Sequence, residues 1–384
     1  MASHRENKPM WPYRIGIEEE YFVSDLRTGN VRRIMSKAFY NACEKELGEA
    51  VTPELLQSQI EVRTPPCGTM QEARDHLSHY RRVLAREAVR HSLAIVASGT
   101  HPLAIWHEQQ QTEKERYGEV REDLQMLAMR NMVCGMHVHV EVPDPESRVG
   151  IMYRLMPFLP PLLALSTSSP FWQGYRTGLL GYRLTAYDEL PRTGLPELFR
   201  NAEEYRRYVD TLTEAGVIKD ASFLWWAVRP SLAHPTLELR VADCCTHVED
   251  TLAIAAIYRG LMRHLVEHAE LNADLDVVGR AVAMENKWRA QRYGTAATFI
   301  DARARTARPI ADVLRYILEL IRADTDALDC TKEAAHAFEI LKRGSSADQQ
   351  IRVYRTARDA GASRPKALKD VVLWLQKNSI PKPV

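Results

Sequence analysis

Four short segments of this chain alternate charged or imidazole side chains with apolar ones, and this alternation is the strongest constraint on its fold. The segments cover residues 17–21, 59–63, 136–140 and 237–241. Successive side chains of a β-strand point to opposite faces, so a period of two predicts strands with one polar and one apolar face.

The polar faces of these four strands carry groups that bind metals or phosphates. They are Glu18 and Glu20 on the first segment, Gln59, Glu61 and Arg63 on the second, His137 and His139 on the third, and Glu238 and Arg240 on the fourth. If the four faces belong to one sheet, several carboxylates meet in one cleft, where they repel each other and lose hydration. A divalent cation cancels that cost, and carboxylates with one imidazole favour Mg²⁺ or Mn²⁺ over Zn²⁺. Magnesium sites of this kind keep positions open for water and phosphate oxygens, which points to ATP.

The same pattern has a simpler interpretation. An antiparallel sheet often has one solvated face, and alternating Glu and Arg are typical of it. His137 alone is more typical of a hydrogen-bonded strand residue than of a metal ligand. The joint occurrence of four such strands favours the cleft.

The order of the expected elements predicts an α+β fold in one catalytic domain over 1–384, with a helical part at 308–384 packed on it. Strands are expected at 12–24, with a hairpin through 25–30 to 31–34, and at 57–64, 94–98, 136–142, 223–229 and 236–241. Helices are expected at 35–47, 70–92, 113–131, 147–166, 203–214, 248–269, 275–292, 308–323, 331–342, 348–360 and 365–378. Strands in the first two thirds and helices in the last third argue against a doubly wound sheet. The irregular stretch 167–196 is typical of a binding loop.

Charge and composition exclude some partners. Lys and Arg number 51 and Asp and Glu 50, so there is no bulk attraction for nucleic acid or an anionic membrane. Residues 345–384 carry eight Lys or Arg against three Asp or Glu, which favours a solvated helix face over nucleic-acid binding. The apolar stretch 151–165 is interrupted by Arg154 and three prolines and falls short of the roughly 20 residues that span a bilayer.

The cysteines and the first residues indicate the compartment. Six cysteines form no C-x-x-C pair, and the first 14 residues contain no apolar signal core. We therefore expect reduced thiols in a cytoplasmic protein.

Six motifs resemble those of a known family and keep its order. They are IGIEEEY at 15–21, QIEVRT at 59–64, GMHVHV at 135–140, SSPFWQGY at 168–175, LELRVAD at 237–243 and ENKWRAQRYG at 285–294. They resemble the type 2 glutamate–cysteine ligases, and more narrowly the bacterial carboxylate–amine ligases called the YbdK family.

The resemblance implies a glutamine-synthetase-like fold, in which a curved antiparallel sheet forms the floor of an active-site funnel and helices pack outside. It also implies ATP-dependent joining of a carboxylate to an amine with Mg²⁺, or Mn²⁺ in its place. Glutamate and cysteine are the suspected substrates, although glutamate–cysteine ligase activity is commonly weak in this subgroup.

The resemblance also assigns roles to individual residues. The metal ligands it implies are Glu18, Glu20, Glu61, His139 and Glu238, with Glu54 as a weaker match. Arg240 faces the transferring phosphate, and Glu238 and Arg240 are the catalytic candidates. Lys287, Arg289 and Arg292 lie near phosphates or the acid substrate. Arg183 holds a substrate carboxylate, and His137 and Arg63 are further substrate-binding candidates.

Three other functions remain open at this point. A zinc hydrolase would use His137 and His139, but it needs further ligands, and His234 and His247 lie outside the strand faces. A small-molecule kinase on the same fold would form a phosphorylated product and no amide. A non-catalytic protein would bind metal and nucleotide without forming ADP. A homo-oligomer, most simply a dimer, is expected on general grounds.

Overall fold

The computed structural model describes residues 13–112, 118, 122–142 and 144–382. Within these residues, seven strands form one sheet in the order β2-β3-β1-β5-β9-β8, with β4 also paired to β1, and every pairing is antiparallel. The strands are β1 (Ile15–Asp25), β2 (Val51–Pro53), β3 (Gln59–Arg63), β4 (Leu93–Val96), β5 (Met136–Glu141), β8 (Val228–Pro230) and β9 (Thr236–Leu239). The predicted α+β class is confirmed, and all four alternating segments lie in this sheet.

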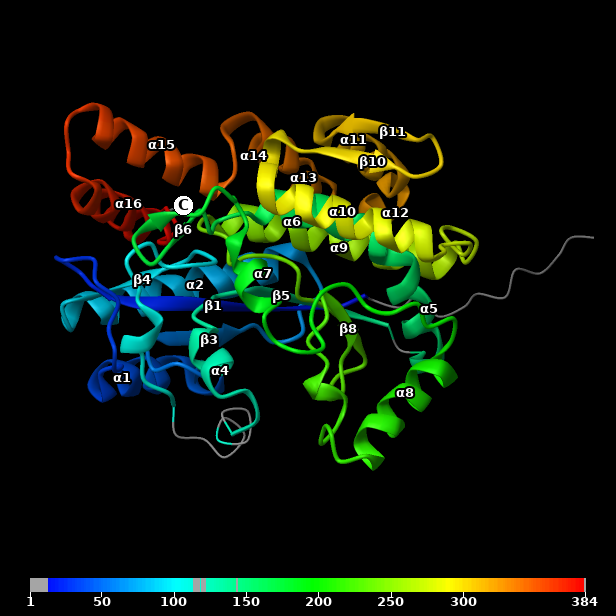
Figure 1. Ribbon diagram of the computed structural model, residues 1–384, viewed down its shortest axis with the longest axis horizontal. Helices are drawn as coiled ribbons and strands as arrows, with labels where there is room; N and C mark the ends of the chain where they lie inside the picture. The colour runs from blue at the N-terminus through cyan, green and yellow to red at the C-terminus, as the bar shows by residue number, and fades with distance from the viewer. Residues whose placement is uncertain (1–12, 113–117, 119–121, 143, 383–384) are drawn as a thin grey trace, which may run out of the picture.

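Helices cover one face of the sheet (Figure 1). The helices before the C-terminal part are α1 (Lys37–Leu47), α2 (Met70–Arg90), α4 (Met126–Arg130), α5 (Pro145–Leu155), α6 (Leu159–Ser166), α7 (Tyr182–Tyr187), α8 (Ala202–Glu214), α9 (Val248–Glu267) and α10 (Val277–Tyr293). Helix α2 begins at a capping box in which Thr69 and Glu72 each bond the other's backbone N–H. Helix α9 is apolar on nearly all sides and is buried, as expected for a central helix in contact with β1 and β5.

The face of β1 that meets these helices also holds a buried ion pair that the sequence pattern did not reveal. Glu19 has no exposed surface, and both its oxygens accept hydrogen bonds from Arg81 of α2, at 2.6 and 2.9 Å. Arg81 also donates to the backbone carbonyls of Thr246 and Ser379, at 2.7 and 3.3 Å. The hydroxyl of Ser379 in turn accepts the backbone N–H of Ala97 at 2.8 Å. One guanidinium group therefore joins the sheet, α2 and the end of the described chain.

The C-terminal part is helical, as predicted. Its helices are α11 (Ile310–Leu320), α12 (Arg322–Ala327), α13 (Thr331–Ala335), α14 (Ala337–Arg343), α15 (Ser346–Asp359) and α16 (Arg364–Asn378). Helix α16 contacts β4, and the Gln376 side chain donates to the Ser24 hydroxyl of β1 at 2.9 Å.

Several predicted elements differ from the structure. The strand expected at 223–229 is wrong over most of its length, because a 3₁₀ turn (Ala221–Phe223) precedes β8. The hairpin β10 (Thr298–Asp301) and β11 (Thr306–Pro309) was not predicted, because β11 is polar and exposed and has no apolar alternation. The hairpin expected after β1 is reduced to a single bridge between Ser24 and Val31. Most of the helix expected at 113–131 lies outside the described residues, and the part that the structure describes includes α4.

The apolar stretch at 151–165 belongs to a helical run that matches the helix expected at 147–166. Residues Pro145–Ser166 form a run of 22 residues, long enough to cross a membrane, within which an 18-residue window has mean hydropathy 1.3, but 78% of that window is buried inside the protein. The prolines are compatible with this helical run because a 3₁₀ turn (Met156–Phe158) separates α5 from α6. The prolines then lie in the first turn of the 3₁₀ segment or of α6, where a backbone N–H is not needed. Its burial identifies the run as a core helix.

The loop expected at 167–196 contains three short elements. The strands β6 (Phe171–Trp172) and β7 (Tyr175–Arg176) form a small hairpin, and α7 follows it. Arg176 and Arg183 of this loop line two different cavities.

Candidate active site

A cavity of about 620 Å³ lies against the polar face of the sheet. Its floor consists of side chains from β1, β3, β5 and β9, and its walls come from residues near α4, from α7 and from the 220–234 segment. The alternation seen in the sequence therefore places the expected metal ligands on the floor of one cavity.

The strand register explains how these side chains meet. Glu20 of β1 pairs with Glu61 of β3, and on the other side of β1 Glu18 pairs with His137 of β5. His139 pairs with Glu238 of β9. Partners in register share a face of the sheet, so these six residues form a continuous row.

Two groups of side chains in this row could each hold a metal ion. Glu18, His139 and Glu238 form one, Glu20, Glu54 and Glu61 form the other, and within each group the potential ligand atoms lie within 4.8 Å of one another. Glu54 follows β2 in a loop, and the structure brings it to the site although its sequence match was the weakest. Carboxylate oxygens with a single imidazole suit Mg²⁺ or Mn²⁺, so the donor set fits the expected cation.

Hydrogen bonds set the orientation of the two imidazoles. The Nδ1 of His139 lies 2.9 Å from the Thr236 hydroxyl, which leaves Nε2 facing Glu18 at 3.7 Å. The Nδ1 of His137 lies 3.2 Å from Glu18. Burial lowers the pKa of both rings, that of His137 to about 4, and a neutral ring is the form that ligates metal.

The second acidic group is under electrostatic strain. Burial and the charge of Glu54 raise the pKa of Glu20 to about 8. Burial and the same neighbour raise the pKa of Glu61 well above its usual range. Carboxylates that resist ionisation together are relieved by a bound cation.

The first acidic group is already compensated by neighbouring positive charge. Burial raises the pKa of Glu18, but the hydrogen bond with His137 and the electrostatic interactions with His137 and His139 outweigh it and leave the pKa at about 2. Burial acts likewise on Glu238, but the charges of Arg240 and Arg229 hold its pKa well below the usual range.

Two arginines flank Glu238, of which the sequence analysis named one. Arg240 pairs with one oxygen of Glu238 and donates to the Tyr187 hydroxyl at 3.2 Å. Arg229 of β8 donates to the other oxygen at 2.8 Å and is fixed by the carbonyl oxygens of Ser222 and Leu224. Arg229 was missed because β8 is too short to show an alternating pattern.

Arg183, the expected ligand of a substrate carboxylate, lies at the cavity with only 1% of its surface exposed. Its NH1 donates to the Arg240 carbonyl at 3.2 Å, and its Nε is buried without a partner among the described residues. The guanidinium lies over Gly135, where an added Cβ would come within 2.2 Å of NH2. Glycine at 135 therefore makes room for Arg183.

The other expected substrate-binding residues also lie at the cavity. His137 is in its floor, with Nε2 buried and unpartnered in the described chain and 3.9 Å from Glu20. Arg63 lies on its margin, with 45% of the side chain exposed, and pairs with Glu61 at 3.2 Å.

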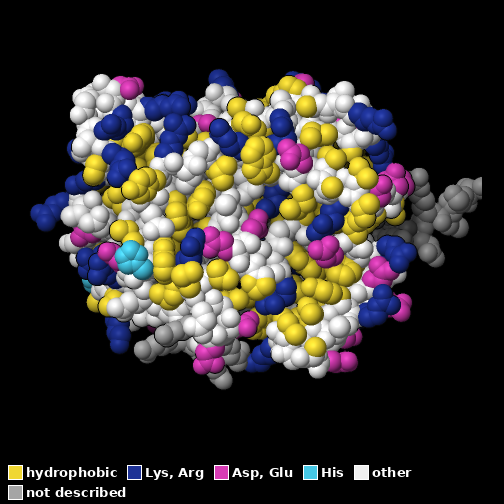
Figure 2. Space-filling model, viewed as in Figure 1, with side chains coloured by type: hydrophobic (Ala, Val, Ile, Leu, Met, Phe, Trp, Pro, Cys, Tyr) yellow, Lys and Arg dark blue, Asp and Glu magenta, His cyan; other side chains and the backbone are white. Residues whose placement is uncertain are grey.

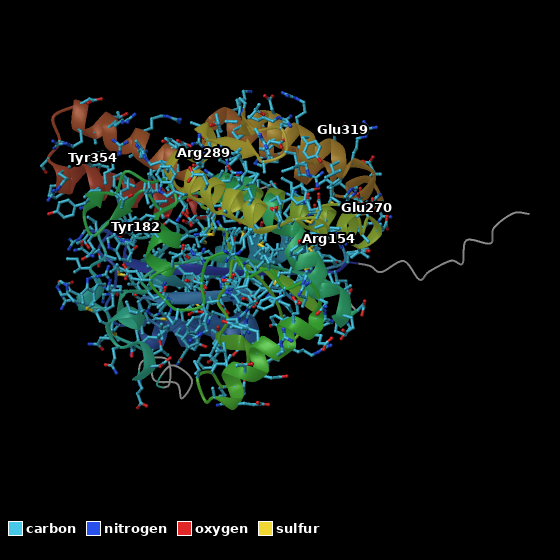
Figure 3. All side chains as sticks on the ribbon, turned by 45° about the vertical axis from the view of Figure 1, so that its right-hand side comes forward. Arg154, Tyr182, Glu270, Arg289, Glu319 and Tyr354 are labelled. Atoms are coloured by element: carbon cyan, nitrogen blue, oxygen red, sulfur yellow. The ribbon has the colours of Figure 1, made fainter. Side chains whose placement is uncertain are left out.

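The basic residues of α10 do not line this cavity. Lys287 is buried and paired with Asp188, which follows α7. Arg289 donates to the Thr298 carbonyl at 2.5 Å, in the helical layer shown in Figure 3. Arg292 lies over the ring of Tyr293 and lines a different cavity. These three residues were expected near phosphates or the acid substrate, but none of them lines the acidic cavity. The spacing of residues on a helix does not reveal which neighbour the helix packs against.

The donor set bears on the hydrolase alternative. His234 lies outside the strands, as expected, but it lines the cavity with its ring 5.9 Å from that of His139. His247 packs instead against Trp374. Each of the two ligand groups holds at most one histidine, which favours a magnesium-type site over a zinc hydrolase.

Comparison with known proteins gives a family match over most of the chain. Residues 14–369 match the family described as Glutamate-cysteine ligase family 2. A protein of Bradyrhizobium diazoefficiens named "Putative glutamate--cysteine ligase 2" is 48% identical over 343 residues, which cover 89% of this chain and 80% of that protein.

Two solved structures share the fold. A bifunctional glutathione synthetase from Pasteurella multocida superposes with a TM-score of 0.72 at 14% identity, over 95% of this chain and 52% of that one. A glutamate–cysteine ligase from Francisella tularensis in complex with AMP gives a TM-score of 0.69 at 12% identity, over 96% of this chain and 89% of that one.

Proposed function

Because the chain belongs to glutamate–cysteine ligase family 2, and is thus an ATP-dependent carbon–nitrogen ligase, we propose that it joins a carboxylate to an amine through an acyl phosphate at the acidic cavity. The family resemblance inferred from six sequence motifs is confirmed by this match. The observation that carries the proposal is the pair of acidic ligand groups on one face of the sheet, next to Arg240 and Arg183.

The proposal assigns cation binding to both acidic groups. Glu18, His139 and Glu238 hold one Mg²⁺ or Mn²⁺, and Glu20, Glu54 and Glu61 hold another. The cations neutralise the carboxylates and the phosphate oxygens of ATP. The raised pKa values of Glu20 and Glu61 support this assignment, because a cation compensates those charges.

The chemistry solves a leaving-group problem. A carboxylate is a poor electrophile because its oxygen does not leave. In the proposed first step a carboxylate oxygen attacks the γ-phosphorus of ATP and ADP departs. The amine nitrogen then attacks the acyl carbon, phosphate leaves, and the nitrogen loses a proton. Protein groups contribute mainly position and charge stabilisation in such transfers.

Two arginines have separate roles in this scheme. Arg240 stabilises the charge that develops on the moving phosphoryl group, and its pairing with Glu238 fixes its direction. Arg183 binds a second carboxylate of the acid substrate through its buried, underused guanidinium. His137 and Arg63 complete the substrate side, and a funnel-shaped entrance over the sheet is part of the proposal.

Glutamate as acid and cysteine as amine, with weak activity, are the proposed substrates. A single domain with residues 308–384 packed on it, a homodimer and a cytoplasmic location stay predictions.

The test is an ADP-release assay with Mg²⁺ over a panel of amino acids and amines, followed by mass spectrometry of the product. We expect ADP and an amide in equal amounts, and neither from Glu238→Gln. A phosphorylated product without an amide would indicate a kinase, and turnover with Zn²⁺ but without ATP would indicate a hydrolase.

A further inference from the structure

A second cavity, of about 420 Å³, lies among β7, the end of α10 and α15. Four arginines line it: Arg176, Arg292, Arg352 and Arg355. We call this cavity the basic cleft. Among the described residues, none lines both the basic cleft and the acidic cavity.

The four guanidinium groups come from three separate segments of the chain. Arg176 ends β7, Arg292 lies in the last turn of α10, and Arg352 and Arg355 lie one turn apart on α15. Figure 2 shows Lys and Arg side chains gathered over the region where Figure 1 draws α15. Like charges brought together by the fold repel each other, and those one turn apart on a helix destabilise it.

The protein itself provides little compensation for this charge. In the part of the chain that the structure describes, none of the four arginines forms an ion pair. Arg292 lies over the Tyr293 ring at 5.1 Å, and Arg352 donates to the Arg343 carbonyl at 3.1 Å.

Two carboxylates also line the cleft and offset part of its charge. Asp348 accepts hydrogen bonds from Ser345 and Thr295, in capping α15. Asp359 is exposed at the last turn of α15, as the four arginines are. Four guanidinium groups against two carboxylates leave the cleft positive.

We propose that the basic cleft binds a small molecule that carries at least two phosphoryl groups. Guanidinium groups match phosphate oxygens with paired N–H donors, and charge-assisted bonds of this kind are about twice as strong as neutral ones. The volume of the cleft fits a small ligand, and its concave shape favours such a ligand over the extended backbone of a nucleic acid. The basic composition of residues 345–384 thus has a local purpose beyond solvation.

The experiment uses inorganic tripolyphosphate as the probe and isothermal titration calorimetry on the full chain, with EDTA present. EDTA removes the divalent cations that would hold phosphate in the acidic cavity, and the arginine variants below show which cavity binds the probe. We expect saturable binding by the wild type. The double variant Arg352→Gln/Arg355→Gln should bind at least about tenfold more weakly, since each lost charge-assisted bond costs about that factor or more.

Matched controls make the result specific. Arg207→Gln/Arg315→Gln removes two arginines that do not line the cleft and should bind as the wild type does. Arg176→Gln, on a different segment, should weaken binding in the same direction, so the test does not depend on the folding of one variant. Glu238→Gln should bind tripolyphosphate normally while losing ligation, which separates this proposal from the proposed function.

Four outcomes would overturn the proposal. The wild type does not bind tripolyphosphate at millimolar concentration, or the Arg352/Arg355 variant binds it as tightly as the wild type does. NaCl at the same ionic strength gives the same heat of binding as tripolyphosphate, or the protein binds a single-stranded RNA tightly and does not bind tripolyphosphate.

Discussion

Glu20 and Glu61 face each other directly across the β1–β3 ladder, on the floor of the acidic cavity. Glu54 joins them from the loop after β2. Burial and mutual repulsion raise the pKa of Glu20 and Glu61, and a bound cation would offset that unfavourable energy.

Replacing Glu61 with glutamine removes one ionisable carboxyl and keeps the size of the side chain. We expect Glu61→Gln to raise the free energy of unfolding of the metal-free protein by about 1–2 kcal/mol, because glutamine avoids both the repulsion with Glu20 and Glu54 and the cost of protonating a buried carboxylate. Thermal unfolding in EDTA measures this, as a rise of a few degrees in Tm.

Excess Mg²⁺ should reverse the order of stability. The wild type gains stability by binding the cation and Glu61→Gln gains less, because a ligand is missing. A variant that is less stable than the wild type in EDTA would contradict the assignment of the second acidic group.

Arg240 is expected to act on the rate more than on nucleotide binding. Arg240→Lys keeps a positive charge near Glu238 but loses the fixed guanidinium geometry. We expect kcat to fall by about 10²–10³ with a smaller change in KM for ATP, as for other groups that stabilise developing charge. Steady-state ADP release measures both constants, and a rise in KM with unchanged kcat would place Arg240 in ground-state binding instead.

Gly135 should be sensitive to the addition of one methyl group. Gly135→Ala puts a Cβ within 2.2 Å of the Arg183 guanidinium, which must move. We expect the protein to fold, since the displaced atoms end a long side chain, and KM for the acid substrate to rise by about tenfold, the value of one good polar contact. Gly150→Ala is the control, because a Cβ there meets nothing within 4 Å. Equal KM values for the two variants would remove Arg183 from substrate binding.

His101 should contribute to loss of stability in acid. It is fully buried, its Nδ1 accepts the Leu103 backbone N–H at 3.2 Å, and burial lowers its pKa to about 3. Between pH 6.5 and about 3 the unfolded chain binds a proton that the folded chain does not, so stability falls as the pH falls through that window. The effect amounts to about 2 kcal/mol at pH 5.

His101→Asn keeps an acceptor and removes the titration. We expect the free energy of unfolding of this variant to depend less on pH between 6.5 and 4 than that of the wild type, as measured by urea denaturation. His79→Asn, on the exposed side of α2, serves as control. Parallel pH profiles for His101→Asn and the wild type would count against a proton-free buried ring.

Period-two alternation predicted the face of the strand on which each of these side chains lies, and the family resemblance named them as one set. Glu18, Glu20, Glu61, His139 and Glu238 lie where it placed them, because a strand fixes the face of each side chain and one sheet holds all four strands. Local pattern determines orientation here, and the pairing of the strands follows from burying their apolar faces against α2 and α9.

Residues brought in by loops and short elements could not be placed in the same way. Glu54 and His234 reach the cavity from loops, and Arg229 from a strand of three residues, so no periodicity marks them. The basic residues of α10 were expected near phosphates or the acid substrate but do not line the acidic cavity. Their motif suggested phosphate at the acidic site, whereas Lys287 pairs with Asp188 and Arg292 turns to the basic cleft.

Glu19 illustrates a further limit. A charged residue between Glu18 and Glu20 looks like part of the same acidic run, but the strand turns it to the helical face, where Arg81 neutralises it. Sequence alternation shows that Glu19 lies on the opposite face from its neighbours. It does not show that Arg81, 62 positions away in the sequence, pairs with Glu19 on that face.

The contact between Arg81 and Ser379 has a consequence for how the chain is made. The residues of β1 and α2 are synthesised early. The Ser379 carbonyl, which accepts a hydrogen bond from the Arg81 guanidinium, is synthesised only after α16. Until then the Arg81 guanidinium has its bonds to Glu19 and to the Thr246 carbonyl but lacks the bond to Ser379. We therefore expect the contacts between Arg81 and the C-terminal part to form after translation has passed residue 379, and not during elongation.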